Sequence, residues 1–235
     1  MKICATLRHE FVVQYLRTLH EADWLTVLME YAAGGSLKDR LESHRTANSP
    51  FKPITVATWL AQLGSAVAYI HSEDVLHRDL SASNVFLTHT DTTNAAIKIG
   101  DFGLSREGTK IGTGAFGTTT MCGTPTYASP ELINGEQCGP PSDVWAVGVL
   151  AYELLTLSHP FSSASGVGEL FRAICASKPS EPGLLDAAGY PGQIKAVASP
   201  AHLLHPDPGQ RMTIEELLEV LRSRRDHKPI KADVR

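Results

Sequence analysis

The pattern of apolar and polar residues changes character along this chain of 235 residues. Two short runs rich in β-branched and aromatic residues come first, at residues 11–16 and 24–31, and the polar residues 20–23 separate them. Runs of this kind on either side of a polar turn predict a β-hairpin. Gly34-Gly35 then breaks the pattern, and Ser36 with Asp39 three residues later predicts the start of a short helix.

Helical periodicity dominates the rest of the chain. Apolar residues recur at helical spacing over residues 55–72, and residues 142–157 are apolar nearly all round, which is typical of a helix buried inside a domain. Short strands are predicted at residues 85–87 and 97–99, and the polar, glycine-rich and threonine-rich residues 106–120 predict a flexible loop. Strands come first and helices second, so we expect an α+β fold in which helices dominate.

The last helix has its own start signal. Thr213-Ile214-Glu215-Glu216 is a capping box, in which the threonine and the second glutamate can each satisfy a backbone amide.

Composition excludes several classes of protein. Apolar residues make up 43% of the chain and charged residues 20%, and the net charge of −4 gives no overall attraction to nucleic acid or anionic lipid. The four cysteines are widely spaced and include no C-x-x-C pair, which favours reduced thiols over zinc ligands or a disulfide framework (Cys4, Cys122, Cys138 and Cys175). No uninterrupted apolar run is long enough to span a bilayer, and no secretory signal is evident. We therefore expect a cytoplasmic protein with no nucleic-acid or membrane partner.

The residues able to do chemistry lie in three ordered motifs. His77-Arg78-Asp79 is followed by Asn84, five residues after the aspartate, and Asp101-Phe102-Gly103 comes about twenty residues later. Gly123-Thr124-Pro125 then precedes Ser129-Pro130-Glu131. Each motif alone has an ordinary alternative, such as a surface aspartate, an asparagine in a turn or a hairpin. The ordered set resembles the catalytic half of a eukaryotic protein kinase.

The resemblance is to the serine/threonine type, and it is greatest to the NIMA-related kinases. Asn84-Val85-Phe86-Leu87-Thr88, Lys98-Ile99-Gly100-Asp101 and the Ser129-Pro130-Glu131 variant carry the second similarity. The expected fold is accordingly protein-kinase-like, with a complete, mainly helical C-lobe, the hinge and a two- to three-strand remnant of the N-lobe.

The kinase resemblance implies specific catalytic roles. Asp79 would be the base that orients the acceptor hydroxyl of a serine or threonine in a protein substrate. Asn84 and Asp101 would hold Mg²⁺, which prefers hard oxygen ligands and would bridge the phosphates of ATP. No cue identifies a regulatory partner.

The nucleotide site would include the segment Glu30-Tyr31-Ala32-Ala33-Gly34-Gly35, which resembles the hinge of these kinases. Backbone groups of Glu30 and Ala32 would hydrogen-bond adenine, and Met29 would be the gatekeeper behind it. Phe86 would lie under the adenine ring, although a core aromatic is an equally good interpretation from sequence alone.

The activation segment carries further expectations from the resemblance. Thr124 would hydrogen-bond Asp79, as is typical of serine/threonine kinases. Thr120 would be an activating phosphosite facing Arg78 and Arg106, with a solvent-exposed loop threonine as the alternative. Downstream, Glu131 and Arg211 would form a buried structural pair.

The chain also departs from the family pattern. No glycine-rich loop, strand lysine or helix glutamate precedes the hinge, and residues 1–9 resemble only the end of that helix. The glycine-rich residues 111–117 imitate the missing loop, but they follow Asp101 and are interpreted as a flexible stretch. We expect an N-terminally truncated domain, with an N-lobe remnant at 1–31, a C-lobe at 32–225 and a basic tail at 226–235. The remnant should be the least stable part, with the apolar faces of its strands (Phe11, Val13, Leu25 and Val27) partly exposed.

A second departure lies in the catalytic loop. Ser81 stands where serine/threonine kinases have a lysine that contacts the γ-phosphate, and Ser83 stands where tyrosine kinases have an arginine. Loss of one preorganised donor costs about 10²–10³ in rate, so this chain alone should be weak or inactive. The alternative is a pseudokinase or a kinase-derived scaffold that binds other proteins.

Overall fold

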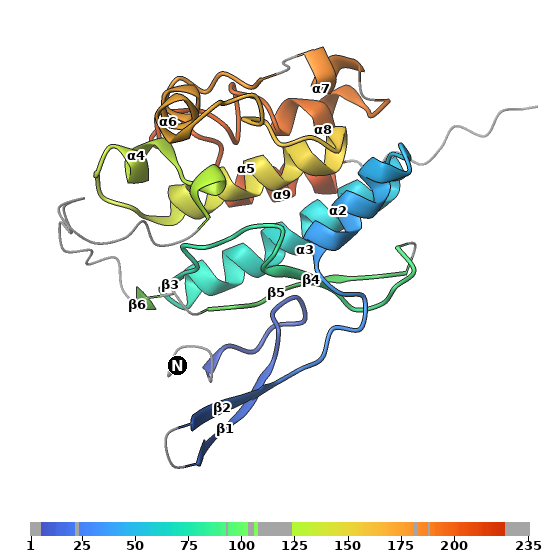
Figure 1. The fold of residues 1–235 in the computed structure, drawn as a ribbon, viewed down its shortest axis with the longest axis vertical. Helices are drawn as coiled ribbons and strands as arrows, with labels where there is room; N and C mark the ends of the chain where they lie inside the picture. The colour runs from blue at the N-terminus through green and yellow to red at the C-terminus, as the bar shows by residue number, and fades with distance from the viewer. Residues whose placement is uncertain are drawn as a thin grey trace, which may run out of the picture.

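Three pairs of short strands lie beside a group of packed helices (Figure 1). The computed structural model describes residues 6–21, 24–92, 94–102, 106–107, 124–180, 183–187 and 189–223. The helices are α2 (Leu37–Thr46), α3 (Pro53–Ser72), α4 (Pro130–Ile133), α5 (Pro140–Thr156), α6 (Val167–Cys175), α7 (Gly183–Ala187), α8 (Gly192–Val197) and α9 (Ile214–Arg222), with a 3-10 turn, η1 (Pro125–Tyr127), before α4. The α+β prediction with dominant helices is confirmed.

The strands form three antiparallel pairs. The hairpin joins β1 (Tyr15–Glu21) to β2 (Trp24–Met29), with register from Tyr15 opposite Met29 to Glu21 opposite Trp24. Inside the helical part, β3 (Val75–Leu76) pairs with β6 (Arg106–Glu107), and β4 (Val85–Leu87) pairs with β5 (Ile97–Ile99). The predicted strands at 85–87 and 97–99 are confirmed.

The prediction of a first strand at residues 11–16 is wrong, because the strand of the hairpin begins at Tyr15. Residues 11–13 run beside β5 instead: the Val13 amide donates to the Ile99 carbonyl at 2.8 Å, and the Ile99 amide donates to the Phe11 carbonyl at 2.9 Å. Val12 is buried there. The apolar residues 11–13 therefore attach the hairpin to the helical part and are not a strand of the hairpin itself.

The segment after Asp101 and the N-terminal segment are described only in part. Residues 106–107 form β6 rather than part of a loop, because they pair with β3, which directly precedes His77. The remaining expected loop, including residues 111–117, lies outside the described residues, as do residues 1–5 of the segment expected to end a helix.

The core lies around α3, which packs against both α5 and α9. Helix α5 buries most of its length, including Trp145 and Tyr152, as its all-round apolar sequence predicts. By length and composition α3 is apolar enough to cross a membrane, and half of its apolar window is buried inside the structure. Its Trp59 indole donates to the Ala95 carbonyl at 2.8 Å, so its apolar face is used for packing.

The predicted helix starts are confirmed. The Ser36 hydroxyl accepts the Asp39 amide at 3.2 Å at the start of α2. At α9 the Thr213 hydroxyl accepts the Glu216 amide at 3.2 Å, and the Glu216 carboxylate accepts the Thr213 amide at 2.8 Å. Each cap satisfies amides that a helix cannot bond internally.

Candidate active site

The loop between β3 and β4 carries Asp79, and a buried carboxylate of α5 fixes the residues before it. The Asp143 carboxylate accepts hydrogen bonds from the backbone amides of His77 at 3.0 Å and Arg78 at 2.9 Å. It also hydrogen-bonds the Nε2 atom of the His71 ring at 2.9 Å. Arg78 has φ of 68°, a left-handed conformation that is uncommon for a residue with a side chain. Burial opposes ionisation of Asp143, but hydrogen bonds from His71 and the Arg78 backbone outweigh it and lower its pKa. Asp143 therefore stays charged and holds this loop in shape.

The Asp79 carboxylate is oriented from two sides. Its Oδ1 accepts the Thr124 amide at 2.9 Å and the Thr124 hydroxyl at 3.1 Å. The Asn84 amide group donates to Asp79 Oδ2 at 3.0 Å and to the Asp79 carbonyl at 2.8 Å. The contact expected between Thr124 and Asp79 is present. One carboxylate is thus held by residues that lie five positions after it and 45 positions after it.

The segment before Asp101 is bonded to the same loop. The Gly100 amide donates to the Asn84 carbonyl at 2.9 Å, and the Gly100 carbonyl accepts the His77 ring at 3.0 Å. Burial lowers the pKa of His77, so its ring is neutral and donates through Nε2. Asp101 itself is exposed, with φ of 57°. These bonds bring Asn84 and Asp101, which the sequence separates, to one place.

The donor set suits Mg²⁺. Because the side-chain nitrogen of Asn84 bonds to Asp79, its side-chain oxygen is the atom left for a cation, and Asp101 adds an exposed carboxylate. In the described part of the chain, no group of three or more His, Cys, Asp or Glu side chains is placed to hold a metal ion by itself. Mg²⁺ commonly binds one or two carboxylates together with substrate phosphates, so a two-residue protein site fits this ion.

The hinge-like segment is tied to the residue that precedes β1 and to β5. The Glu30 amide donates to the Gln14 carbonyl at 2.8 Å, and its carboxylate accepts the Gln14 amide at 3.1 Å. The same carboxylate pairs with Lys98 at 2.9 Å. Among the described residues, neither the Glu30 carbonyl nor the Ala32 amide has a hydrogen-bond partner. These are the two backbone groups that the resemblance to the kinase hinge assigns to adenine.

Gly34 lets the hinge lie directly against β4. Its amide donates to the Leu87 carbonyl at 2.8 Å, and the Leu87 amide donates to the Gly35 carbonyl at 2.9 Å. A Cβ at residue 34 would lie 2.3 Å from the His89 carbonyl oxygen, so only glycine fits. Phe86, also in β4, is partly exposed, whereas its strand neighbours Val85 and Leu87 are buried. Met29 is 50% exposed, so it lies at an open edge of this region.

Two residues that the motifs did not single out join the site to α5. The Tyr127 hydroxyl accepts the Ala82 amide at 3.3 Å and donates to the Glu153 carboxylate. Burial raises the pKa of Glu153 to about 7. The sequence gives no local signal for this pair, because its members lie 26 positions apart.

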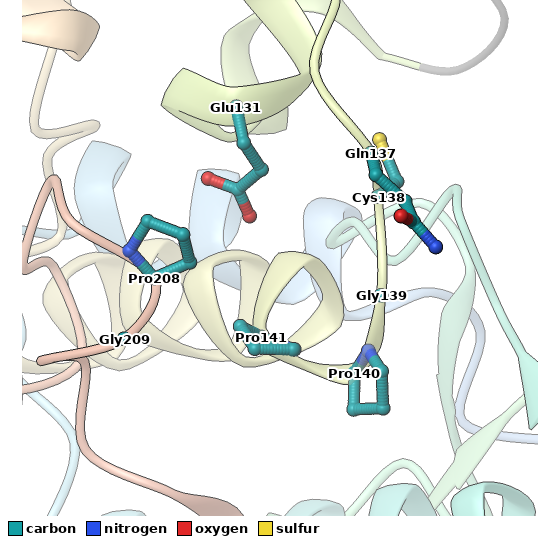
Figure 2. A pocket seen from close by; sticks show the side chains of 8 residues that line it. All are labelled: Glu131, Gln137, Cys138, Gly139, Pro140, Pro141, Pro208 and Gly209. Carbon is teal, nitrogen blue, oxygen red and sulfur yellow. The ribbon is translucent and has the colours of Figure 1, made fainter. Parts of the chain in front are cut away.

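The pair expected between Glu131 and Arg211 is present and bidentate. Arg211 Nη1 and Nη2 lie 2.8 and 2.9 Å from the two Glu131 oxygens, and both residues are buried. Burial opposes ionisation of Glu131, but hydrogen bonds from Arg211 outweigh it and lower the carboxyl pKa. Figure 2 shows Glu131 pointing from α4 toward Pro208 and Pro141, beside a cavity of about 350 Å³.

Other candidate residues are described only in part. Thr120 lies outside the described residues, and only the backbone of Arg106 is described.

Ser81, at the position of the expected lysine, is 1% exposed, and its hydroxyl has no partner in the described part of the chain.

Comparisons with known proteins agree with this geometry. The family model for the protein kinase domain matches residues 1–221. The chain is 30% identical to a putative serine/threonine-protein kinase A of Trypanosoma brucei brucei over 94% of this chain and 48% of that protein. It is 32% identical to serine/threonine-protein kinase Nek9 of Mus musculus over 95% of this chain and 21% of that protein. With human Nek11 the identity is 29%, over 93% of this chain and 32% of that protein.

These matches bear on two expectations. The predicted similarity to serine/threonine kinases, and to the NIMA-related group among them, is confirmed. The chain spans about half, or less, of the length of these curated relatives.

Proposed function

Because this chain belongs to the protein kinase family, we propose that it transfers the γ-phosphoryl group of Mg²⁺·ATP to serine or threonine residues of proteins. The observation that supports this most directly is the double restraint on Asp79. Thr124 and Asn84 hold its two carboxylate oxygens, so the group has one orientation. The alternative role as a kinase-derived scaffold has no specific observation in its favour.

Asp79 would act on the acceptor. Its carboxylate would accept a hydrogen bond from the serine or threonine hydroxyl and take the proton as the oxygen bonds to phosphorus. The bond from phosphorus to the leaving oxygen breaks in the same step, which gives a phosphoprotein and ADP. Correct placement is the main contribution that a protein makes to this reaction.

The other residues would hold the nucleotide. Asn84 and Asp101 would bind Mg²⁺, which neutralises the phosphate charge when it is bound. The Glu30 carbonyl and the Ala32 amide would bind adenine, with Phe86 beneath it and Met29 behind it. Lys98 supports this arrangement because its ion pair fixes the Glu30 side chain.

We propose that transfer by this chain is slow. Ser81 offers no positive charge to the transferring group, and its hydroxyl is buried rather than directed into solvent. A preorganised donor of this kind is worth about 10²–10³ in rate.

The experiment that tests this function measures phosphate incorporation into a mixed serine and threonine peptide, with Mg²⁺·ATP labelled at the γ-phosphate. We expect Asp79→Asn to lower the initial rate by about 10²–10⁴, because the variant cannot accept the proton. The melting temperature of the variant checks that its fold is kept. Equal incorporation by the two proteins, or none by the unaltered chain, would contradict the proposal.

A further inference from the structure

The β1–β2 hairpin leaves the outer edge of β2 without a partner strand. The two strands form a sheet of their own, and the described strands β3 to β6 pair with one another, so none of these covers the edge. In Figure 1 the hairpin projects beyond β4 and β5, away from the helices. An edge strand of six residues with unpaired amides and carbonyls is a template for a further strand.

Exposed apolar side chains gather on the same hairpin. The described residues include seven large apolar side chains that are exposed, and five of them lie between residues 16 and 31 (Leu16, Trp24, Leu28, Met29 and Tyr31). Exposed apolar residues that gather in one place, and are not scattered singly, are typical of a surface that another protein covers.

Alternate residues of β2 direct their backbone groups to the open edge. The Glu30 amide donates to the Gln14 carbonyl, so the backbone groups of Glu30 point across the hairpin. Hydrogen-bonding direction alternates along an antiparallel strand, so the amides and carbonyls of Met29, Val27 and Leu25 point the other way. These three residues are evenly spaced about Val27.

The sequence of β2 lacks the features that keep edge strands apart. It contains no charged residue, no proline and no glycine. The outer edge of β1 differs, because the register of β1 is irregular between Tyr15 and Arg17 and the strand carries charged residues (Arg17 and Glu21). Bulges and charges oppose strand addition, so the β2 edge is the one available for pairing.

A second copy of the chain fits this edge. It brings an identical unpaired strand, and a two-fold axis at Val27 satisfies both edges at once. Antiparallel pairing about that axis sets Val27 opposite Val27 of the second copy, and Leu25 opposite Met29 of the second copy. All three outward-directed residues then exchange backbone hydrogen bonds, about six in total. No like charges face each other, because the strand has none.

We propose that the β2 edge is a self-association surface, through which two copies of the chain form a four-stranded antiparallel sheet in the order β1–β2–β2–β1. The irregular and charged β1 strands are then the outer edges, so association stops at the dimer. One pair of short strands is a small interface, and we expect a dissociation constant on the order of 10–100 µM. Well below this concentration the chain is a monomer with an exposed hairpin.

Sedimentation equilibrium over about 1–500 µM chain tests the dimer. We expect Val27→Lys and Val27→Glu each to weaken association at least about fivefold, because like charges would face each other across the axis. An equimolar mixture of the two variants should associate at least about fivefold more tightly than either alone, because the facing charges are then opposite. Recovery on mixing also shows that both variants keep the folded hairpin.

Thr18→Lys is the matched control. Thr18 lies opposite Val27 within the hairpin but on β1, so the same charge is added away from the β2 edge. This variant should associate as the unaltered chain does. Amide exchange measured by NMR adds a readout for each residue: protection of the Leu25, Val27 and Met29 amides should rise with chain concentration.

Several outcomes would overturn the self-association surface. A chain that stays monomeric at about 500 µM would do so, as would happen if a strand of another protein covered this edge. The same holds for a dimer that Val27→Lys leaves unchanged, a mixture no tighter than either variant alone, or growth beyond the dimer. These measurements need no ATP, so their outcome is independent of the kinase function.

Discussion

At the residue scale, two ion pairs of this chain show how burial decides the value of a charge contact. Glu131 and Arg211 are buried and bidentate, whereas Glu42 and Arg45 are exposed neighbours on α2. An exposed pair gains little because water screens it, but a buried charge that loses its partner is left without solvation.

We expect Arg211→Met to lower the free energy of unfolding by about 3–5 kcal/mol, because Glu131 would be left buried and unpaired. Urea denaturation monitored by tryptophan fluorescence measures this. Glu42→Gln is the matched control and should change stability by no more than about 1 kcal/mol. A similar small effect from both variants would show that the buried pair is not structural.

Glu153 gives a prediction with a definite pH dependence. Its pKa is about 7 in the folded chain against 4.5 as the ordinary value, so the folded state binds the proton more tightly. The resulting stabilisation is complete below pH 4.5 and is lost as the pH rises through about 7. Glu153→Gln mimics the protonated form at every pH. We therefore subtract the free energy of unfolding of Glu153→Gln from that of the unaltered chain. This difference should decrease as the pH rises from 4.5 to about 7, by an amount on the order of 3 kcal/mol.

His159 changes the stability in the opposite direction over a similar pH range. For this reason the unaltered chain must be compared with Glu153→Gln at each pH. Its pKa falls from 6.5 to about 4, so its contribution to stability is lost as the pH decreases through that range. Both proteins contain His159, so its contribution largely cancels in the difference. Denaturant titrations at several pH values that show a flat difference would mean that Glu153 ionises normally in the folded chain.

At the element scale, local patterns predicted the elements that depend on local chemistry. The capping box of α9, the Ser36 cap of α2 and the apolar helix α5 were all predicted from a few adjacent residues. Residues 11–16 were placed wrongly because their apolar character reflects packing against β5, a strand more than eighty positions away. Strand pairing of this kind depends on tertiary context, which no short run of residues contains.

The β1–β2 hairpin should be the least protected of the described elements. Trp24 is 79% exposed and Leu16 56% exposed, and a two-stranded hairpin is marginal in water. Of the residues expected to be partly exposed, Phe11, Val13 and Val27 are half-buried, and the side chain of Leu25 lies outside the described residues.

We expect backbone amides of β1 and β2 to exchange with deuterium at least about tenfold faster than those of α5, because local opening there exposes little buried surface. Hydrogen exchange followed by mass spectrometry measures this, and the short buried pair β4–β5 is the internal comparison. Protection in the hairpin equal to that of α5 would contradict this expectation.

At the scale of the whole molecule, the ordered motifs predicted the fold class and the family, because spacing along the chain carries that information. They did not predict how the site is held together. Asp143, Tyr127 and Glu153 act through contacts between segments 26 to 72 positions apart, and these exist only once α5 has packed behind the loop. The roles of Asn84 and Asp101 toward Mg²⁺ stay a prediction.

The central claim is that Asp101 and Asn84 bind Mg²⁺·ATP, and the most direct measurement is calorimetric titration of the chain with ATP, with and without Mg²⁺. Asp101→Asn removes the charge, and Asp74→Asn is its matched control, because both aspartates are exposed with φ of 57°. Asparagine tolerates this left-handed conformation, so neither variant should strain the backbone. We expect Mg²⁺-dependent binding that Asp101→Asn weakens at least about tenfold and Asp74→Asn leaves unchanged. Binding that is equal in all three proteins, or absent at millimolar ATP, would contradict the claim.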